Sequence, residues 1–194
     1  MNNQMTVIAN GSFQKYWTWI TVIGWLVAHA VANQITGWIF PDAANETLGS
    51  SPVYYLIFGG ILGLFQWWCL RGKIPHSIGW VLFTAAGLLF ASWLINKRLY
   101  RIEAISIALQ TSPILGKAII GVILGLAQYL FIRNKLTFAS VWLIMFPPIW
   151  IVSTVIMEAS VGWLQPLGIF LFAISTGFMM EKSLQLTTAS KNAA

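Results

Sequence analysis

Residues 59–71 read GGILGLFQWWCLR, and residues 121–133 read GVILGLAQYLFIR. The two stretches match at a constant offset of 62 residues, with two glycines, a glutamine and the final arginine in register. The match continues beyond the arginines, because Lys73 pairs with Lys135 and Trp80 with Trp142 at the same offset. Self-similarity at a fixed period is the signature of repeated structural units. The sequence therefore predicts a protein built from copies of one unit.

A third copy becomes visible when alternate hydrophobic segments are aligned on the tryptophan near their start. The aligned segments run from Trp17 to Gly24-Trp25, from Trp80 to Gly87-Leu88, and from Trp142 to Ile149-Trp150. The second half of the third copy reads Ala173-x-x-x-Gly177-Phe178-x-Met180, so methionine replaces the glutamine of the other copies. Each copy holds two hydrophobic segments. We predict three consecutive two-helix hairpin repeats, all oriented the same way, at about residues 16–72, 78–134 and 138–180.

The composition places these hairpins in a membrane. Of the 194 residues, 58% are hydrophobic and only 8% charged, whereas about 25% of the residues in soluble domains are charged. About 20 apolar residues cross a hydrocarbon core of roughly 30 Å. Six windows meet this requirement, at Tyr16–Phe40, Val53–Leu70, Ile78–Ile95, Ile114–Ile132, Phe138–Met157 and Gly162–Met180. This pattern excludes soluble enzymes and nucleic-acid-binding modules.

The predicted fold class is therefore an all-α integral membrane protein with six transmembrane helices. Residues 16–180 form a single membrane domain, residues 1–15 a cytoplasmic N-terminal segment, and residues 181–194 a flexible cytoplasmic tail. An alternative takes Tyr16–Val27 as the apolar part of a signal peptide that is cleaved after Ala28-His29-Ala30. The participation of the first segment in the repeat favours a transmembrane helix.

Basic residues divide unequally between the two ends of the predicted bundle. Six spans place both termini on one side, together with the second and fourth connections. That side carries Glu181 and seven basic residues, which are Lys15, Arg71, Lys73, Arg133, Lys135, Lys182 and Lys191. The opposite side balances Lys97, Arg98, Arg101 and Lys117 with Asp42, Glu46, Glu103 and Glu158. Because cytoplasmic loops carry the excess of lysine and arginine, both termini are predicted to be cytoplasmic.

The repeated motif supplies the first candidate site residues. Gly59 and Gly63, like Gly121 and Gly125, form Gly-x-x-x-Gly pairs, which let a neighbouring helix approach closely. Gln66 and Gln128 lie three residues beyond the second glycine of each pair, on roughly the same face. An amide in hydrocarbon needs polar partners, so these glutamines contact either another helix or a ligand.

Three further kinds of residue are candidates for contacts or binding. Arg71 and Arg133 end their helices, where a cation complements the helix dipole and phospholipid phosphates, or where the two arginines frame an anion site. His29 and Asn33 lie one turn apart late in the first span. A histidine there either makes a hydrogen bond in the core or ligates a haem or pigment metal. The tryptophans near the predicted cytoplasmic boundary are typical of an interfacial belt, and they are Trp17, Trp19, Trp67, Trp68, Trp80 and Trp142.

Reaction signatures are absent from the sequence. The chain has no Gly-rich phosphate loop, no His-Glu-x-x-His, no Gly-x-Ser-x-Gly and no Cys-x-x-Cys, and its single cysteine, Cys69, cannot form an intramolecular disulfide. None of the five carboxylates falls in the middle of a predicted span. We therefore predict no catalytic residue, no metal site and no cofactor.

The pattern at 59–71 and 121–133, each followed nine residues later by Trp80 or Trp142, resembles small multispanning membrane proteins of photosynthetic and other environmental bacteria. That group has no assigned activity, so the resemblance implies a bacterial inner or thylakoid membrane and carries over no functional residue. Three two-helix repeats are also similar to the mitochondrial carrier architecture. The carriers' Pro-x-Asp/Glu-x-x-Lys/Arg signature is missing, which limits that likeness to an analogy of fold.

Abundant packing chemistry with few titratable groups favours a non-catalytic accessory or scaffold protein. Its predicted partners are membrane lipids and either another membrane protein or a second copy of itself, and no nucleic acid. The alternative function is a small-solute or lipid transporter with a site framed by Gln66, Gln128, Arg71 and Arg133.

Overall fold

The computed structural model describes residues 12–40, 51–97, 99–159 and 165–192 and is helical throughout its regular structure. The described residues form six long helices, one short helix and a 3-10 turn at Leu99–Arg101. The helices are α1 (Ser12–Ile39), α2 (Pro52–Leu70), α3 (Gly79–Lys97), α4 (Glu103–Thr111), α5 (Pro113–Ile132), α6 (Ala139–Ala159) and α7 (Gln165–Asn192).

The six long helices are all long and apolar enough to cross a membrane. The predicted all-α fold with six spans is confirmed, and the spans pair as the hairpins α1–α2, α3–α5 and α6–α7. Proline begins α2 and α5, at Pro52 and Pro113, where the missing N–H costs no helical hydrogen bond. Gly72 follows α2 with a φ of +77°, a left-handed conformation that glycine adopts without strain.

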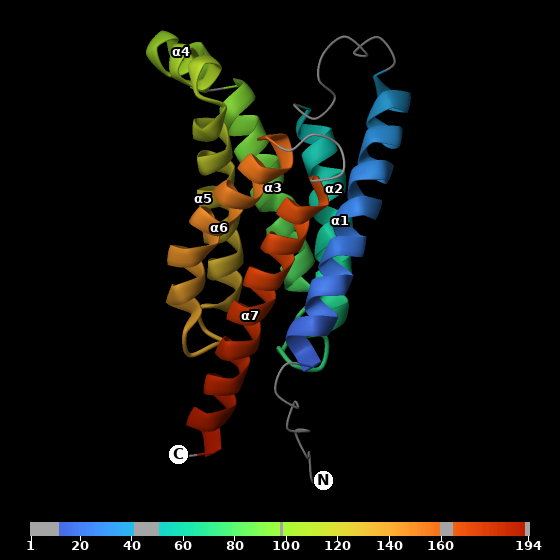
Figure 1. Ribbon diagram of the computed structural model, residues 1–194, viewed down its shortest axis with the longest axis vertical. Helices are drawn as coiled ribbons and strands as arrows, with labels where there is room; N and C mark the ends of the chain where they lie inside the picture. Colours follow the sequence, from blue (N-terminus) through green and yellow to red (C-terminus); the bar gives the residue numbers. More distant parts are fainter. Residues whose placement is uncertain (1–11, 41–50, 98, 160–164, 193–194) are drawn as a thin grey trace.

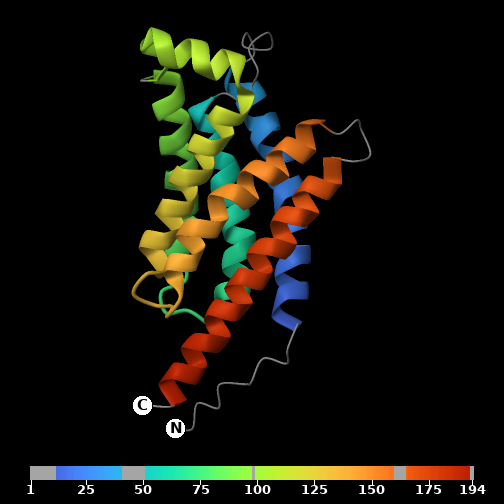
Figure 2. The same ribbon diagram turned by 60° about the vertical axis from the view of Figure 1, so that its left-hand side comes forward.

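The helices form a closed ring in the order α1, α2, α3, α5, α6, α7. Helices that follow each other in the chain pack against each other, and α7 packs against α1 to complete the ring. The first residues of α1 and the last residues of α7 lie at one end of the bundle, here called the terminal end, together with the connections at 71–78 and 133–138 (Figure 1). The short helix α4 lies across the opposite end (Figure 2).

The prediction of a flexible tail from residue 181 is wrong for residues 181–192. α7 continues through Asn192, because its extension is held by the neighbouring elements. The buried Glu181 accepts hydrogen bonds from the Gln14 backbone N–H at 2.7 Å and from the Gln185 amide at 3.0 Å. The Thr137 backbone N–H donates to Thr187 Oγ1 at 3.0 Å, which joins the 133–138 connection to α7.

Smaller corrections concern the ends of the predicted spans. α1 begins at Ser12 rather than at Tyr16, so residues 12–15 are helical and only residues 1–11 of the expected N-terminal segment lie outside the described residues. Asp42 and Glu46, assigned to the opposite side from the charge pattern, also lie outside the described residues. Residues 193–194, the end of the expected tail, do so as well.

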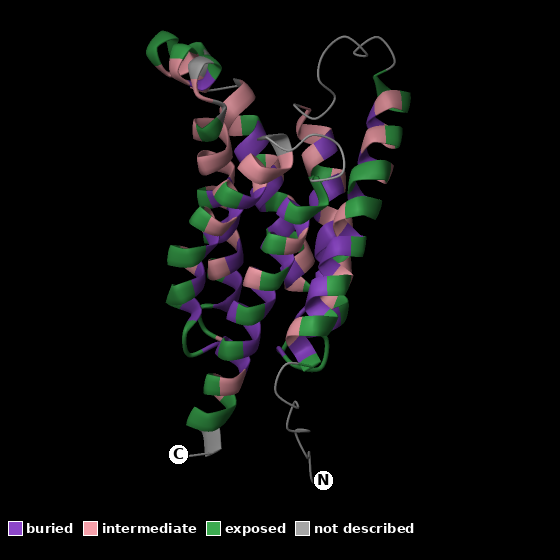
Figure 3. Ribbon diagram, viewed as in Figure 1, coloured by how far each residue is buried: buried purple, intermediate pink, exposed green. Residues whose placement is uncertain are grey.

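Burial follows the ring, with buried residues facing its interior and exposed residues facing outward (Figure 3). The outward residues include large apolar side chains such as Leu82, which is 67% exposed, and Ile144, which is 70% exposed. A water-soluble monomer rarely exposes so much contiguous apolar surface. The outer face of the ring is therefore suited to lipid acyl chains or to other helices.

Candidate functional site

Gln66 and Gln128 accept hydrogen bonds from tryptophans that lie fourteen residues further along the chain. Trp80 Nε1 donates to Gln66 Oε1 at 2.9 Å, and Trp142 Nε1 donates to Gln128 Oε1 at 3.2 Å. Each bond joins the second helix of one hairpin to the first helix of the next, α2 to α3 and α5 to α6. Gln128 also donates from Nε2 to Thr84 Oγ1 at 3.1 Å. Both glutamines are only 2% exposed, so their amides cross-link helices in the interior.

The third hairpin closes the ring with different residues. Trp17 Nε1 donates to Thr176 Oγ1 at 3.1 Å, which joins α1 to α7. Thr176 Oγ1 in turn donates to the Phe172 carbonyl at 2.8 Å. Met180, at the position of the glutamines in the aligned motif, is fully buried. A threonine one turn earlier on α7 therefore accepts the indole N–H that glutamine accepts in the other two hairpins.

The three tryptophans that donate these bonds meet inside the bundle. The ring of Trp80 lies edge-on to Trp17 at a centroid distance of 6.1 Å and to Trp142 at 5.5 Å. All three are at most 2% exposed. The prediction that they belong to an interfacial belt is therefore wrong for Trp17, Trp80 and Trp142. Each of their indole N–H groups has a hydrogen-bond acceptor inside the helix bundle, which allows the whole side chain to be buried. Trp19 and Trp68, in contrast, lie on the outer surface.

A second aromatic layer lies further from the terminal end. Trp25 of α1 packs against Phe58, Trp150 and Phe172 at centroid distances of 5.1, 5.7 and 5.6 Å. These contacts connect α1 to α2, α6 and α7 through the interior. The rings of Trp25 and Trp150 therefore pack on each other.

The glycines of the motif pack within the chain. A Cβ added at Gly59 or Gly63 would lie 2.9 Å from a backbone Cα of α3. A Cβ added at Gly121 would lie 2.9 Å from Trp150, and one at Gly125 would lie 3.1 Å from Phe146. The first pair admits the backbone of α3, and the second pair admits aromatic rings of α6. Because helices of the same chain fill these glycine faces, a partner protein would have to pack on other surfaces of the bundle.

His29 joins α1 to α2. Its Nδ1 is hydrogen-bonded to the Tyr54 hydroxyl, and the two rings lie edge-on at 5.8 Å. Tyr54 is buried, while the imidazole of His29 is exposed at the edge of the contact. Asn33 lies one turn further along α1 and is half-buried. One nitrogen of His29 is thus engaged in an interhelical contact.

The structure does not bring Gln66, Gln128, Arg71 and Arg133 into one site. Both glutamines are buried and hydrogen-bonded, whereas both arginines are exposed at the terminal end. The guanidinium of Arg71 lies 3.6 Å from the ring centroid of Trp68. Arg133 follows the last residue of α5.

Lysines stack on aromatic rings at the same end. The Nζ atoms of Lys73, Lys135 and Lys182 lie 5.7, 3.2 and 5.7 Å from the ring centroids of Phe13, Phe131 and Phe178, respectively. Partial burial lowers the pKa of Lys135. Cation–π contacts of this kind fix the position of an ammonium group without neutralising its charge.

Thr84, Thr176 and Tyr54 are the partners that reasoning from the sequence missed. Thr84 had a usable signal, because it follows Trp80 by four residues as Thr21 follows Trp17. Thr176 and Tyr54 had none, since their partners are 159 and 25 residues away. Buried polar atoms without a partner among the described residues are Thr21 Oγ1, Thr36 Oγ1, Trp150 Nε1 and Ser153 Oγ.

Titratable groups do not converge in the described part of the chain. Within it, no group of three or more histidine, cysteine or acidic residues could hold a metal ion. Cys69 is buried in α2. Comparisons with protein-family models, with curated proteins and with solved structures found no match. The contacts among the described residues are those of helix packing.

Proposed function

We propose that this is a non-catalytic accessory or scaffold protein of the membrane, which packs against other helices, lipids or a membrane complex. The observation that supports it best is the use of Gln66 and Gln128. Both amides are buried, and both accept an indole N–H from the next hairpin. Interior polar groups that could have bound a solute instead connect helices, as the Trp17–Thr176 bond also does.

The outer surface of the ring supplies the contact area in this proposal. Every hairpin exposes large apolar side chains, including Trp38 on α1, Leu82 on α3 and Ile144 on α6. The motif glycines are already used inside the chain. A partner protein therefore packs on the exposed apolar faces, and lipid covers the rest.

We also propose that the three hairpins are copies of one ancestral unit. Support comes from the hydrogen bonds, because the Gln66–Trp80 and Gln128–Trp142 pairs have the same separation of fourteen residues and join equivalent helices. The close approaches recur as well. A Cβ added at Gly24 would lie 2.7 Å from Phe65 of α2, and one at Gly87 would lie 2.8 Å from Ala127 of α5. In the alignment of the repeats, Gly24 and Gly87 are equivalent.

The proposed location is a bacterial inner or thylakoid membrane with both termini in the cytoplasm. The start of α1 and the end of α7 share one end of the bundle (Figure 1). Exposed basic residues gather there, among them Lys15, Arg71, Arg133 and Lys182. An excess of lysine and arginine is the usual mark of the cytoplasmic side.

The test is native mass spectrometry of the protein released gently from its own membranes, with an absorption spectrum of the same sample. The proposal expects a partner protein or a second copy at fixed stoichiometry. Leu82→Ala and Ile144→Ala, which alter only the outer face, should weaken that assembly, whereas Gly60→Ala adds a methyl group where no atom lies within 4 Å and serves as the control.

A different outcome would favour transport. A partner-free protein that gives saturable solute flux in reconstituted vesicles would overturn the scaffold proposal. If the flux were also lost in Gln66→Ala with Gln128→Ala, the interior amides would be assigned to a solute path.

A further inference from the structure

The terminal end carries an excess of positive charge. Its described cations are Lys15, Arg71, Lys73, Arg133, Lys135 and Lys182. The acidic residue of this end, Glu181, is buried and accepts hydrogen bonds from the Gln14 backbone N–H and the Gln185 amide. The exposed cations of this end therefore outnumber its acidic residue and can meet an anionic group from outside the described chain.

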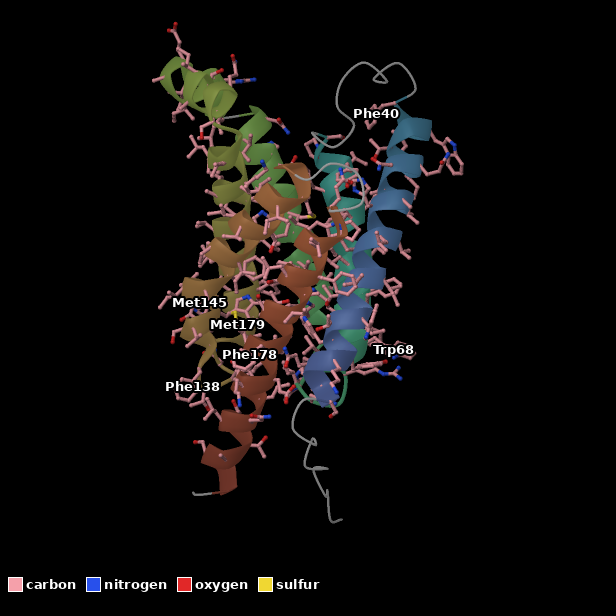
Figure 4. The ribbon with its side chains drawn as sticks, in the orientation of Figure 1. Phe40, Trp68, Phe138, Met145, Phe178 and Met179 are labelled. Carbon is pink, nitrogen blue, oxygen red and sulfur yellow. The ribbon has the colours of Figure 1, made fainter. Side chains whose placement is uncertain are left out.

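Four of these six cations lie over aromatic rings. Arg71 and Lys182 lie over rings that are exposed, and these two pairs define two corners. The α2 corner consists of Trp68 and Arg71, with the Arg71 guanidinium 3.6 Å from the centroid of Trp68. The α7 corner consists of Phe178 and Lys182, with Lys182 Nζ 5.7 Å from the centroid of Phe178. Figure 4 shows Trp68 on one side of the terminal end and Phe138 and Phe178 on the other.

Each corner joins a cation to an exposed apolar surface. Trp68 is 48% exposed and Phe178 is 52% exposed, and both belong to membrane-spanning helices. The amphipathic ring of tryptophan favours the headgroup region of a bilayer, and the Phe178 ring adds exposed apolar surface beside Lys182. A free anion would use only the cation, whereas a phospholipid places its phosphate at the cation and its acyl chains along the adjacent apolar helix surface. The combination matches the amphipathic shape of a lipid.

We propose that the α2 corner and the α7 corner each bind the headgroup of an anionic phospholipid. Arg71 and Lys182 contact the phosphate, and Trp68 and Phe178 lie beside the glycerol and the first acyl carbons. The inference concerns the lipid-facing surface at the terminal end of the helix bundle, so it does not depend on whether the protein is a scaffold or a transporter. It also gives the protein a preferred orientation and lipid environment.

The experiment measures lipids retained by the purified protein in native mass spectrometry after exchange into mixed micelles of phosphatidylglycerol and phosphatidylcholine. Arg71→Gln and Lys182→Gln each remove one stacked cation. Two matched controls also remove one positive charge: Lys15→Gln at the same end, where the side chain stacks on no ring among the described residues, and Arg101→Gln at the opposite end. Trp68→Leu removes the ring and keeps the charge.

A lysine or arginine near an anionic surface contributes enough to change lipid occupancy about fivefold. We expect phosphatidylglycerol retention to fall by about that factor in Arg71→Gln and Lys182→Gln, by less in Trp68→Leu, and little in the two controls. Unfolding temperatures in pure phosphatidylcholine should match the parent chain, which separates lipid binding from folding. If Arg71→Gln does not fold, Arg71→Lys should fold and keep the lipid.

Two results would overturn the proposal. One is equal retention of phosphatidylglycerol and phosphatidylcholine by the parent chain, because the corners would then not distinguish headgroup charge. The other is an equal loss in Lys15→Gln or Arg101→Gln, because the attraction would then be a general effect of net charge.

Discussion

Single polar residues contribute to the stability of this ring of helices through side-chain hydrogen bonds between helices, because the hydrocarbon core offers no competing hydrogen-bond partners. Gln128 is the clearest example, since its oxygen accepts from Trp142 and its nitrogen donates to Thr84. Three helices thus meet at one amide. Gln66 accepts from Trp80, and Thr21, the counterpart of Thr84 in the first hairpin, has an unpartnered hydroxyl. Two equivalent glutamines therefore carry different numbers of bonds.

The first prediction follows from this difference. Gln128→Leu should lower the stability of the protein more than Gln66→Leu, by about 1 kcal/mol, since side-chain hydrogen bonds in membrane proteins contribute about 0.6 kcal/mol on average and an unpaired buried donor costs more. Thermal unfolding in a mild detergent measures both. Adding Trp142→Phe to Gln128→Leu should recover part of the loss by removing the orphaned indole N–H. Equal destabilisation by the two leucine variants would contradict the bonding pattern.

The second prediction tests whether Met180 occupies the glutamine position of the third hairpin. Thr176→Val removes the acceptor of the Trp17 indole N–H and should cost about 1 kcal/mol. If Met180 is equivalent to Gln66 and Gln128, then Thr176→Val with Met180→Gln should restore an acceptor and recover the loss. The unfolding temperature of the single and double variants decides between the outcomes. A double variant that is less stable than Thr176→Val would show that the third hairpin has diverged in geometry.

At the scale of the helix, hydropathy and length located most of the secondary structure. The predicted spans Val53–Leu70 and Ile114–Ile132 agree with α2 and α5 to within one residue at each end, since charged or proline residues border both. α7 departs furthest from its predicted span. Its residues 181–192 are polar, so hydropathy ended the helix at Met180, whereas Glu181 and Thr187 bind groups that are far away in the sequence. No local pattern reports such partners.

The third prediction concerns the packing of α2 on α3. Gly63→Ala should lower stability by about 1–3 kcal/mol, because its Cβ would lie 2.9 Å from the Val81 backbone and the helices must separate. Gly60→Ala on the same helix is the matched control, since no atom lies within 4 Å of its Cβ. Its stability should stay equal to that of the parent chain or rise slightly through helix propensity. Thermal unfolding of the two variants side by side checks the difference, and equal losses would refute the close approach.

For the whole molecule, the sequence predicted the individual helices and the equivalent glutamines better than the contacts that close the ring of helices. The offset of 62 residues indicated that Gln66 and Gln128 are equivalent, and the structure gives them equivalent indole partners. It could not indicate that Trp17, Trp80 and Trp142 meet in the interior, because tryptophan near a membrane boundary also fits an interfacial belt. The alternative site with Arg71 and Arg133 rested on sequence proximity alone. Burial separates the two arginines from the glutamines.

The last prediction tests the orientation of the whole molecule. The terminal end carries the exposed cations, so the positive-inside bias predicts that it faces the cytoplasm and that α4 lies on the opposite side. Cys69 is 2% exposed and should not react in the folded protein, which makes Cys69→Ser a mild background for labelling. In that background, Ile107→Cys on α4 should react with a membrane-impermeant maleimide in intact cells, because Ile107 is 55% exposed. Ser190→Cys, near the end of α7, should react only after the membrane is opened. The reverse pattern would place the cationic end outside, and the anionic leaflet contacted by the α2 and α7 corners would then be the outer one.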